Sequence, residues 1–207
     1  MMSHTKDYLI VSVIGLAFGL FLIPVLSNIK LPFLTLNIAS ASLITIFFIA
    51  FANVALWIAF VIGTRIPVVL QFAKFAAVGA FSTLFAFGIL NVLIALTKVT
   101  SGIGYSAFIG LAFICATTGS YFLNRYWTFS IQNAANTGEF GKFLSVSVVG
   151  FAVNVGIASF VVNVVSHPAV FTPERWANLG ALSATVISLI WNFFGYKFIV
   201  FKRSTNS

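Results

Sequence analysis

The chain contains apolar runs that are too long and too free of charge to fold in water. The run from Ile38 to Gly63 contains no Asp, Glu, Lys or Arg. A helix of about 20 apolar residues crosses the hydrocarbon core of a bilayer, where every backbone N–H and C=O needs an internal partner. Only 7% of the residues are charged and the mean hydropathy is +1.10, whereas soluble domains carry about 25% charged residues. The sequence therefore predicts an all-α integral membrane protein.

Six such runs follow one another along the chain. The predicted transmembrane helices are Tyr8–Leu26, Ile38–Gly63, Phe75–Leu96, Tyr105–Phe129, Phe143–Val165 and Ala177–Phe201, with loops at 27–37, 64–69, 97–104, 130–138 and 166–176. A cleaved signal peptide is the alternative for the first run. Little positive charge precedes that run and no A-x-A-like site follows it, so we expect a retained helix. Gly15 and Gly19 form one G-x-x-x-G pattern in it, which is common enough by chance that we prefer the chance interpretation to a packing role.

The second part of the chain is an internal duplication. The sequence SYFLNRYWTF at 120–129 returns as NFFGYKFIVF at 192–201, and residues 71–88 align without gaps on 139–156. Each copy, 71–130 and 139–203, is therefore predicted to be a hairpin of two helices. Because two spans return the chain to its starting side, both copies enter the membrane from the same side and the repeat is parallel. The predicted domains are a two-helix extension at 1–70, a four-helix domain at 71–203 and a tail at 204–207.

The positions of the basic residues predict the orientation. With six spans, one side collects eight cations, which are Lys6, Arg65, Lys74, Arg125, Lys142, Lys197, Lys202 and Arg203, and the other side has Lys30, Lys98 and Arg175. Because cytoplasmic loops carry the excess of Lys and Arg, we expect both termini in the cytoplasm. Small residues at i, i+4 and i+8 recur in both copies and predict two close-packing ridges at the centre of the bundle. The ridges are Ala112, Ala116 and Ser120, and Ala184, Ser188 and Asn192.

The residues that most chemistry requires are scarce. The three acids, Asp7, Glu139 and Glu174, lie at helix ends, so no buried carboxylate is expected as a proton relay. His4, His167 and Cys115 form neither a metal-ligand cluster nor a nucleophile–base pair in the sequence, and no phosphate-cradling G-x-x-x-x-G-K occurs. The cations are scattered singly at the ends of apolar runs, which argues against nucleic-acid binding. We expect no enzyme activity, metal or cofactor.

Four segments of the duplicated part resemble a known family. They are the opening FAKFAAVG, the segment NRYWTF, the second opening GKFLSVSVVG and the closing NFFGYKFIVF. In order and spacing they are similar to the GtrA-like proteins, and the resemblance covers residues 71–202. It departs at Ser82 and Thr83, where the family often has an Asn, and residues 1–70 lie outside the pattern.

The resemblance implies a function. GtrA-like proteins are associated with lipid-linked sugars such as undecaprenyl-phosphate-glucose, which are moved from the cytoplasmic to the outer leaflet for later transfer to a surface polysaccharide. It therefore implies a multi-pass protein of the inner (cytoplasmic) membrane that works as a flippase. A flippase for such a lipid needs cations for the phosphate and aromatic and amide groups for the sugar.

The residues expected to meet these needs lie near the helix ends. The predicted phosphate ligands, arranged as a clamp, are Lys74, Arg125, Lys142 and Lys197, and the predicted sugar contacts are Tyr121, Asn124, Trp127, Asn154, Trp191, Asn192 and Tyr196. Topology alone also places cations and interfacial aromatics at these levels. For Asn154, in the middle of a helix, we prefer an interhelical hydrogen bond to a sugar contact.

Two functions remain open. One is a translocase for the polyprenyl-phosphate-sugar; the other is a non-transporting subunit that recruits or stabilises a membrane glycosyltransferase. Beside the lipid, that glycosyltransferase and a second copy of the chain are the partners considered. A translocase needs polar groups through the bilayer, and the candidates are Asn91, Thr117, Thr118, Asn154, Ser159, Ser183, Thr185 and Ser188. A scaffold needs none, so their convergence on one cavity would favour transport.

Overall fold

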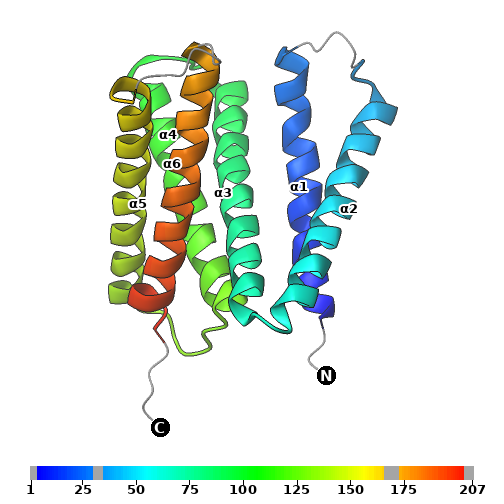
Figure 1. Ribbon diagram of the computed structural model, residues 1–207. Coiled ribbons are helices and arrows are strands. Elements are labelled where there is room, and N and C mark those ends of the chain that lie inside the picture. The colour runs from blue at the N-terminus through cyan, green and yellow to red at the C-terminus, as the bar shows by residue number, and fades with distance from the viewer. Residues whose placement is uncertain (1–3, 30–34, 166–172, 203–207) are drawn as a thin grey trace. The chain divides into compact units, whose positions relative to one another are not determined.

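The computed structural model describes residues 4–29, 35–165 and 173–202, and in them the chain is helical without any strand. The helices are α1 (Thr5–Ile29), α2 (Ile38–Gly63), α3 (Pro67–Thr97), α4 (Gly102–Leu123), α5 (Thr137–Asn163) and α6 (Pro173–Gly195). Short π-helices continue α4 and α6, namely η1 (Asn124–Thr128) and η2 (Tyr196–Val200). Figure 1 shows these helices as long rods joined by short connections.

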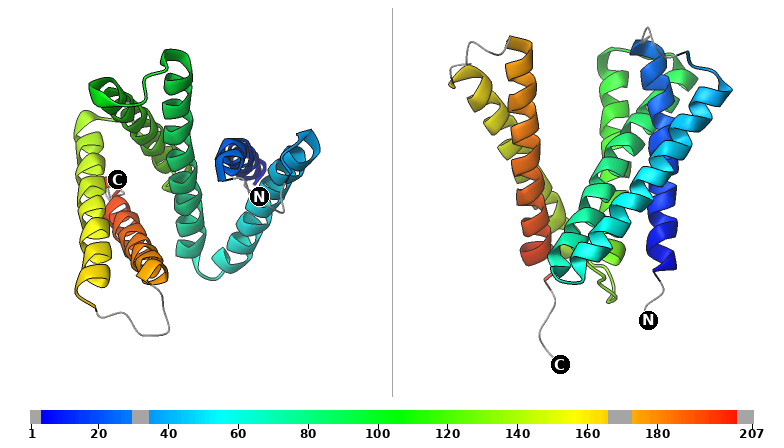
Figure 2. Two further views of the ribbon diagram at one scale, coloured as in Figure 1. Left: turned by 90° about the horizontal axis from the view of Figure 1, so that it is seen from above. Right: turned by 45° about the vertical axis from the view of Figure 1, so that its right-hand side comes forward.

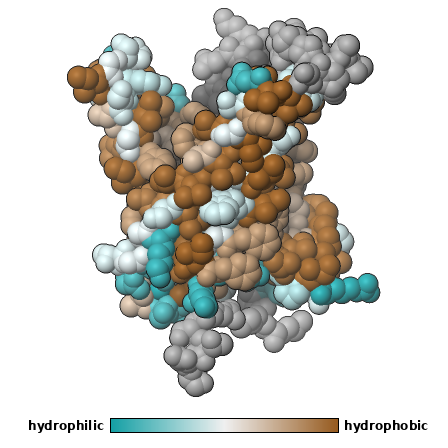
Figure 3. Space-filling model, turned by 60° about the vertical axis from the view of Figure 1, so that its left-hand side comes forward, coloured by the Kyte–Doolittle hydropathy of each residue, from teal (hydrophilic) through white to brown (hydrophobic). Residues whose placement is uncertain are grey.

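All six α-helices are long and apolar enough to cross a membrane, counted over the described residues. This confirms the predicted number of spans. Figure 3 shows apolar side chains covering most of the helix surface in view, with hydrophilic residues gathered toward the helix ends. A surface of this kind suits contact with lipid, because apolar side chains gain nothing from water.

The predicted bounds of α2 hold, and a capping residue marks its start. α2 begins at Ile38 as expected, since the Asn37 side chain accepts a hydrogen bond from the Ser40 N–H and the Ser40 hydroxyl accepts one from the Asn37 N–H. α3, however, begins at Pro67 and not at Phe75. The predicted loop at 64–69 contains Pro67, which was expected to interrupt the helix. Proline is instead favoured at the first helical position, where its missing N–H costs nothing.

α5 also begins earlier than expected, at Thr137, because the Asn136 side chain caps it by accepting from the Glu139 N–H at 2.8 Å. The predicted loop at 130–138 is therefore too long by two residues. Residues 30–34 and 166–172, which carry parts of the two other long loops, lie outside the described residues.

The chain divides into two compact units, residues 1–130 and 131–207. The first unit holds α1 to α4 with η1, and the second holds α5, α6 and η2. The predicted boundary between residues 70 and 71 lies inside the first unit. There, Val11 and Ile14 of α1, Leu56 of α2, Val78 of α3 and Trp127 of η1 form one buried cluster. The two extension helices thus share a core with the helices that follow them.

Close backbone contact holds α1 against α2. A Cβ atom added to Gly15 would lie 2.7 Å from the Phe48 carbonyl oxygen, and one added to Gly19 would lie 2.5 Å from the Cα of Thr45. Beside them, the Asn53 amide donates to the Ser12 hydroxyl at 2.9 Å. The chance interpretation of the G-x-x-x-G pattern was wrong, since both glycines are needed for this approach. The helices spread apart only toward the loop that joins them (Figure 1).

The second unit is a pair of neighbouring helices, α5 and α6, which Figure 2 shows side by side in both views. Gly150 faces the Asn192 amide so closely that an added Cβ would collide with it, and a Cβ on Gly195 would lie 2.5 Å from a methyl of Val146. Ala184 and Ser188 of the predicted ridge are buried, as are Ala112 and Ala116 of the other ridge in the first unit. The meeting of the two ridges remains a prediction.

The π-helices η1 and η2 end their helices in matching ways. The Phe129 N–H donates to the Asn124 carbonyl at 2.8 Å, and the Phe201 N–H donates to the Tyr196 carbonyl at the same distance. Stacked ring pairs repeat as well: Phe122 with Tyr126 at 6.1 Å and Phe194 with Phe198 at 5.8 Å. A π-helical turn contains about one residue more than an α-helical turn, so it changes which side chains face the protein interior. In η1, four of the five residues are buried.

The close contact of the α1 glycines with α2 predicts that an added methyl group will destabilise the protein at Gly19 but not at an uncrowded glycine. Gly19→Ala should lower the free energy of unfolding by about 1–3 kcal/mol, the usual cost of overpacking, because the new Cβ meets the α2 backbone. Gly79→Ala on α3 is the matched control, since a Cβ there meets nothing within 4 Å. Thermal unfolding of the purified protein in detergent measures both. Equal stability of the two variants would contradict this packing.

Candidate functional site

The residues predicted to bind the lipid-linked sugar are divided between the two units. The first unit holds Lys74, Arg125, Tyr121, Asn124 and Trp127, and the second holds Lys142, Lys197, Asn154, Trp191, Asn192 and Tyr196. Each unit therefore carries two of the four cations. The surroundings of these residues differ sharply between the two units.

In the first unit, Lys74 is held by an acid from the extension. Its Nζ lies 2.7 Å from Oδ1 of Asp7, and the same oxygen accepts a hydrogen bond from the indole N–H of Trp127 at 2.6 Å. The lysine also lies over two aromatic rings, 5.9 Å from the centroid of Phe60 and 5.4 Å from that of Trp127. The two charged side chains are only 12% and 19% exposed. Lys74 is thus already bound to an internal anion.

The sequence analysis missed this role of Asp7. It treated the acid as an ordinary helix-end residue, whereas Asp7 sits in the first turn of α1 and accepts both a lysine and a tryptophan. One signal was available: α1 and α3 enter the membrane from the same side, so residues near their amino ends lie at the same depth. That argument brings Asp7 and Lys74 to one level, but it does not tell which helix faces meet.

Arg125 and Lys197 are both packed on aromatic rings. The guanidinium carbon of Arg125 lies 5.0 Å from the ring centroid of Tyr126, and Nζ of Lys197 lies 5.7 Å from that of Phe193 and 5.9 Å from that of Phe198. Arg125 is fully buried, while Lys197 is partly exposed. An aromatic face partly replaces the water that a cation loses on burial. Both cations therefore lie against aromatic faces.

Two further predicted residues of the first unit are buried beside Arg125. Tyr121 is 2% exposed and Asn124 is 1% exposed. The Asn124 amide donates to the Ser120 carbonyl at 3.0 Å and to its hydroxyl at 3.2 Å, and its Oδ1 has no hydrogen-bond partner in the described part of the chain. A buried amide oxygen without a partner is costly, so it is suited to accept from a ligand or a water molecule.

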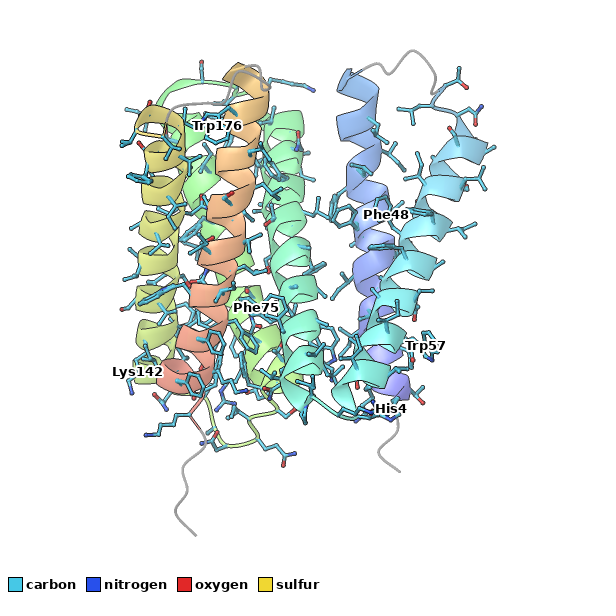
Figure 4. The ribbon with its side chains drawn as sticks, in the orientation of Figure 1. His4, Phe48, Trp57, Phe75, Lys142 and Trp176 are labelled. Atoms are coloured by element: carbon cyan, nitrogen blue, oxygen red, sulfur yellow. The ribbon has the colours of Figure 1, made fainter. Side chains whose placement is uncertain are left out.

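The second unit presents an open groove that combines a cation, a hydroxyl and an indole. It has a volume of about 490 Å³ and is lined by Lys142 and Ser145 of α5, Trp191 of α6 and neighbouring apolar residues. The Trp191 N–H donates to the Val146 carbonyl at 3.3 Å, which fixes the ring on the groove wall. Lys142 is exposed near the end of α5 (Figure 4), and within the described residues it makes no ion pair. Lys142 and Lys74 therefore differ, although the sequence predicts equivalent roles for them.

The other predicted sugar contacts of the second unit lie between its helices. The Tyr196 hydroxyl and the Ser147 hydroxyl are 2.6 Å apart, and the Tyr196 ring stacks on Phe143 at 4.4 Å. The Asn154 amide donates to the Ser188 hydroxyl at 3.2 Å, which is the interhelical hydrogen bond preferred from the sequence. Asn192 packs on Gly150 and its Oδ1 has no partner among the described residues. None of the three lines the groove that holds Trp191.

Three of the eight polar residues considered as a path through the bilayer are bonded to carbonyls of their own helices. Asn91 donates to the Phe87 carbonyl, Thr185 to that of Ala181 and Ser188 to that of Thr185. They line neither the groove described above nor the cavity described below. Among the described residues, no group of three His, Cys, Asp or Glu side chains could hold a metal ion.

Comparison with known proteins gives one match. The model of the family described as GtrA/DPMS, transmembrane domain, matches residues 74–201, more than half of the chain. No curated protein and no solved structure matches. The matched region includes all four predicted phosphate ligands and begins at Lys74, so that Asp7, the partner of this lysine, lies outside it.

The different surroundings of the two lysines predict different effects on stability. Lys74→Met leaves Asp7 without its cation and should lower the free energy of unfolding by about 1–2 kcal/mol, the cost of a partly buried polar group that loses its partner. Lys142→Met should change stability by less than about 0.5 kcal/mol, as surface substitutions usually do. Thermal unfolding in detergent measures the difference. A Lys142 variant as unstable as the Lys74 variant would contradict it.

Proposed function

Because the chain belongs to the GtrA/DPMS transmembrane-domain family, we propose that it moves a polyprenyl-phosphate-linked sugar from the cytoplasmic to the outer leaflet of the inner membrane. The sugar would then serve modification of a surface polysaccharide or glycoconjugate. This lipid has three chemically distinct parts: an isoprenoid chain, a phosphate with negative charge and a sugar with hydroxyl groups. A protein that moves it must bind the two polar parts where the lipid enters.

The observation that carries the proposal is the groove of the second unit. Lys142 offers an exposed cation that makes no ion pair in the described part of the chain, and charge-assisted contacts to phosphate are strong. The Trp191 ring offers an apolar face for one side of a sugar, and the Ser145 hydroxyl, which donates to the Gly141 carbonyl at 2.9 Å, can accept from a sugar hydroxyl. The volume of about 490 Å³ lies within the range of small-molecule sites, about 300–1,000 Å³.

The remaining cations extend this proposal. We propose that Arg125 and Lys197 contact the phosphate together with Lys142, and that Lys74 does so once Asp7 has left it. The recurrence of a cation packed on the following aromatic ring, Arg125 on Tyr126 and Lys197 on Phe198, supports a shared role. An arginine can bind two phosphate oxygens at once, which a lysine cannot.

We also propose that the two hairpins are copies of one ancestral unit with the same orientation. The matching π-helices, backbone hydrogen bonds and stacked rings at the ends of α4 and α6 support this. Further upstream, Phe75 and Val78 are buried in the first copy, as are Phe143 and Val146 in the second. The family match at 74–201 spans nearly the whole of the predicted four-helix domain.

One observation favours a second function, a non-transporting subunit that recruits or stabilises a glycosyltransferase. Three of the polar side chains that would form a path through the bilayer, Asn91, Thr185 and Ser188, are bonded to carbonyls of their own helices, and Asn154 bonds across to Ser188. A scaffold needs no such path. In either function we propose that the chain makes and breaks no covalent bond, a proposal supported by the family match and by a groove whose lining offers binding groups.

Transport is tested by reconstitution of the purified chain alone in liposomes with a labelled polyprenyl-phosphate-sugar. Lys142→Gln and Trp191→Ala should each slow translocation about tenfold, the loss of one strong contact. Arg125→Lys should retain part of the activity that Arg125→Ala loses. Lys202→Gln is the control, because Lys202 is an exposed cation just beyond η2. The scaffold function would be supported instead if the wild-type chain does not translocate the lipid but stimulates the activity of a partner glycosyltransferase.

The proposed orientation has its own test. Reporters inserted in the connection between η1 and α5, residues 130–136, should report the cytoplasm, and those between α3 and α4, residues 98–101, the outer side. The reason is the bias of eight cations against three that the sequence predicts. Single cysteines introduced at these positions serve as the reporters, and their labelling in intact cells measures the side on which each connection lies. The two connections should always lie on opposite sides of the membrane. Labelling of residues 130–136 from outside would overturn the orientation.

A further inference from the structure

An apolar cavity lies inside the first unit, between α1, α2 and α3. Its volume is about 330 Å³. On α3 it is bounded by Ala73, Ala76, Ala77 and Ala80, which lie on one face because they are spaced three and four residues apart. These small side chains keep the helix surface flat. The cavity extends along α3 for about two turns.

One end of this cavity is polar and the rest is apolar. Lys74 and Trp127 are the lining residues with a polar group, and every other lining residue is apolar or glycine. Lys74 stands near the amino end of α3, and the lining continues from it into the membrane-spanning part of the helix. The cavity therefore has a cation at one end and an apolar wall along the rest. This arrangement matches an amphiphile, which has a polar head and an apolar chain.

Lipid can reach the cavity from the side. Phe51 and Ala55 of α2 and Ala80 of α3 line it and are also exposed at the protein surface. Both helices are long and apolar enough to span a membrane, so within the first unit this opening lies at the depth of the hydrocarbon. Figure 4 labels Phe48, another lining residue, midway along α2. A chain can therefore enter laterally without leaving an apolar environment.

We propose that this cavity binds the isoprenoid chain of an anionic lipid, and that the lipid phosphate displaces Asp7 from Lys74. Asp7 is then a built-in anion that neutralises Lys74 when the site is empty. Its carboxylate makes two strong contacts, with the Lys74 ammonium at 2.7 Å and the Trp127 N–H at 2.6 Å. A phosphate offers the same kind of oxygen acceptor to the same two donors, so it can take over both.

The small volume favours a single chain over a two-chain phospholipid. At about 330 Å³ the cavity is near the lower limit of small-molecule sites, about 300 Å³. The choice of an isoprenoid chain rests on the proposed function. The site itself does not, because it is built half from the extension helices, which lie outside the family match at 74–201.

The first test measures binding of farnesyl phosphate, a single isoprenoid chain with a phosphate, to the full chain in detergent. Ala55→Phe should fill the cavity and weaken binding about tenfold, as expected when a chain loses its pocket. Ala50→Phe is the matched control, because Ala50 is exposed on the same helix and does not line the cavity. Its affinity should equal that of the wild type. Equal affinities for all three proteins would overturn the proposal.

The second test addresses the exchange at Lys74. Asp7→Asn keeps an oxygen acceptor for Trp127 but leaves Lys74 without an anion. Its unfolding temperature should fall, and farnesyl phosphate should restore it, raising it more than in the wild type. Its affinity for farnesyl phosphate should also rise several-fold, because no internal anion competes. A purely structural ion pair predicts the fall without the restoration, and that result would overturn the exchange.

Two further ligands identify what the site recognises. Farnesol lacks the phosphate and should bind equally to the wild type and to Asp7→Asn. Phosphatidylglycerol, with two chains, should displace farnesyl phosphate poorly, and efficient displacement would overturn the single-chain assignment. These binding results are independent of the transport assay. If the chain does not translocate lipid but the variants bind as stated, the proposed function fails and this site stands. If translocation is normal and the variants bind farnesyl phosphate like the wild type, the proposed function stands and this site fails.

Discussion

The structure depends on how closely its helices can approach one another. In lipid no hydrophobic force presses apolar helices together, so contact relies on van der Waals packing and a few hydrogen bonds. Gly15 and Gly19 bring α1 onto α2, and Gly150 and Gly195 bring α5 onto α6. Short polar side chains then bridge the touching helices, Ser12 with Asn53 in the first unit and Asn154 with Ser188 in the second. These contacts set how the helices pack within each unit, and therefore where the cations and aromatic rings on those helices lie.

The same kind of lysine has two different environments as a result. The proposed duplication gives Lys74 and Lys142 equivalent positions, but the close packing of α1 brings Asp7 to Lys74, whereas Lys142 stays exposed on an open groove. A charge near lipid needs a partner, and an internal carboxylate and a ligand phosphate are alternative ways to supply one. The extension helices therefore change the chemistry of the family domain that follows them.

The π-helices connect packing with these sites. In η1 the extra residue of the π-turn turns Trp127 into the core, where its N–H reaches Asp7, while Arg125 stacks on Tyr126. In η2 the equivalent turn buries Tyr196, which bonds to Ser147, and leaves Lys197 packed on aromatic rings. π-helices are rare and often lie at functional sites, because they aim side chains where a regular helix would not. Neither one was expected from the sequence.

The sequence by itself determined the membrane class, the six helices, the bounds of α2 and the family, because length, hydropathy and capping are local properties. It also placed Lys142 and Trp191 at one level, which the structure brings together on one groove. Only the tertiary structure decided that Asp7 holds Lys74 and that Gly15 and Gly19 pack on α2. It also decided that Tyr196 and Asn192 lie between helices and that the partner of Asn154 is Ser188. The physical reason is that helices that are apolar on all sides carry no periodic pattern to show which faces meet. Pairing across helices depends on those faces, so it exists only once the helices have packed.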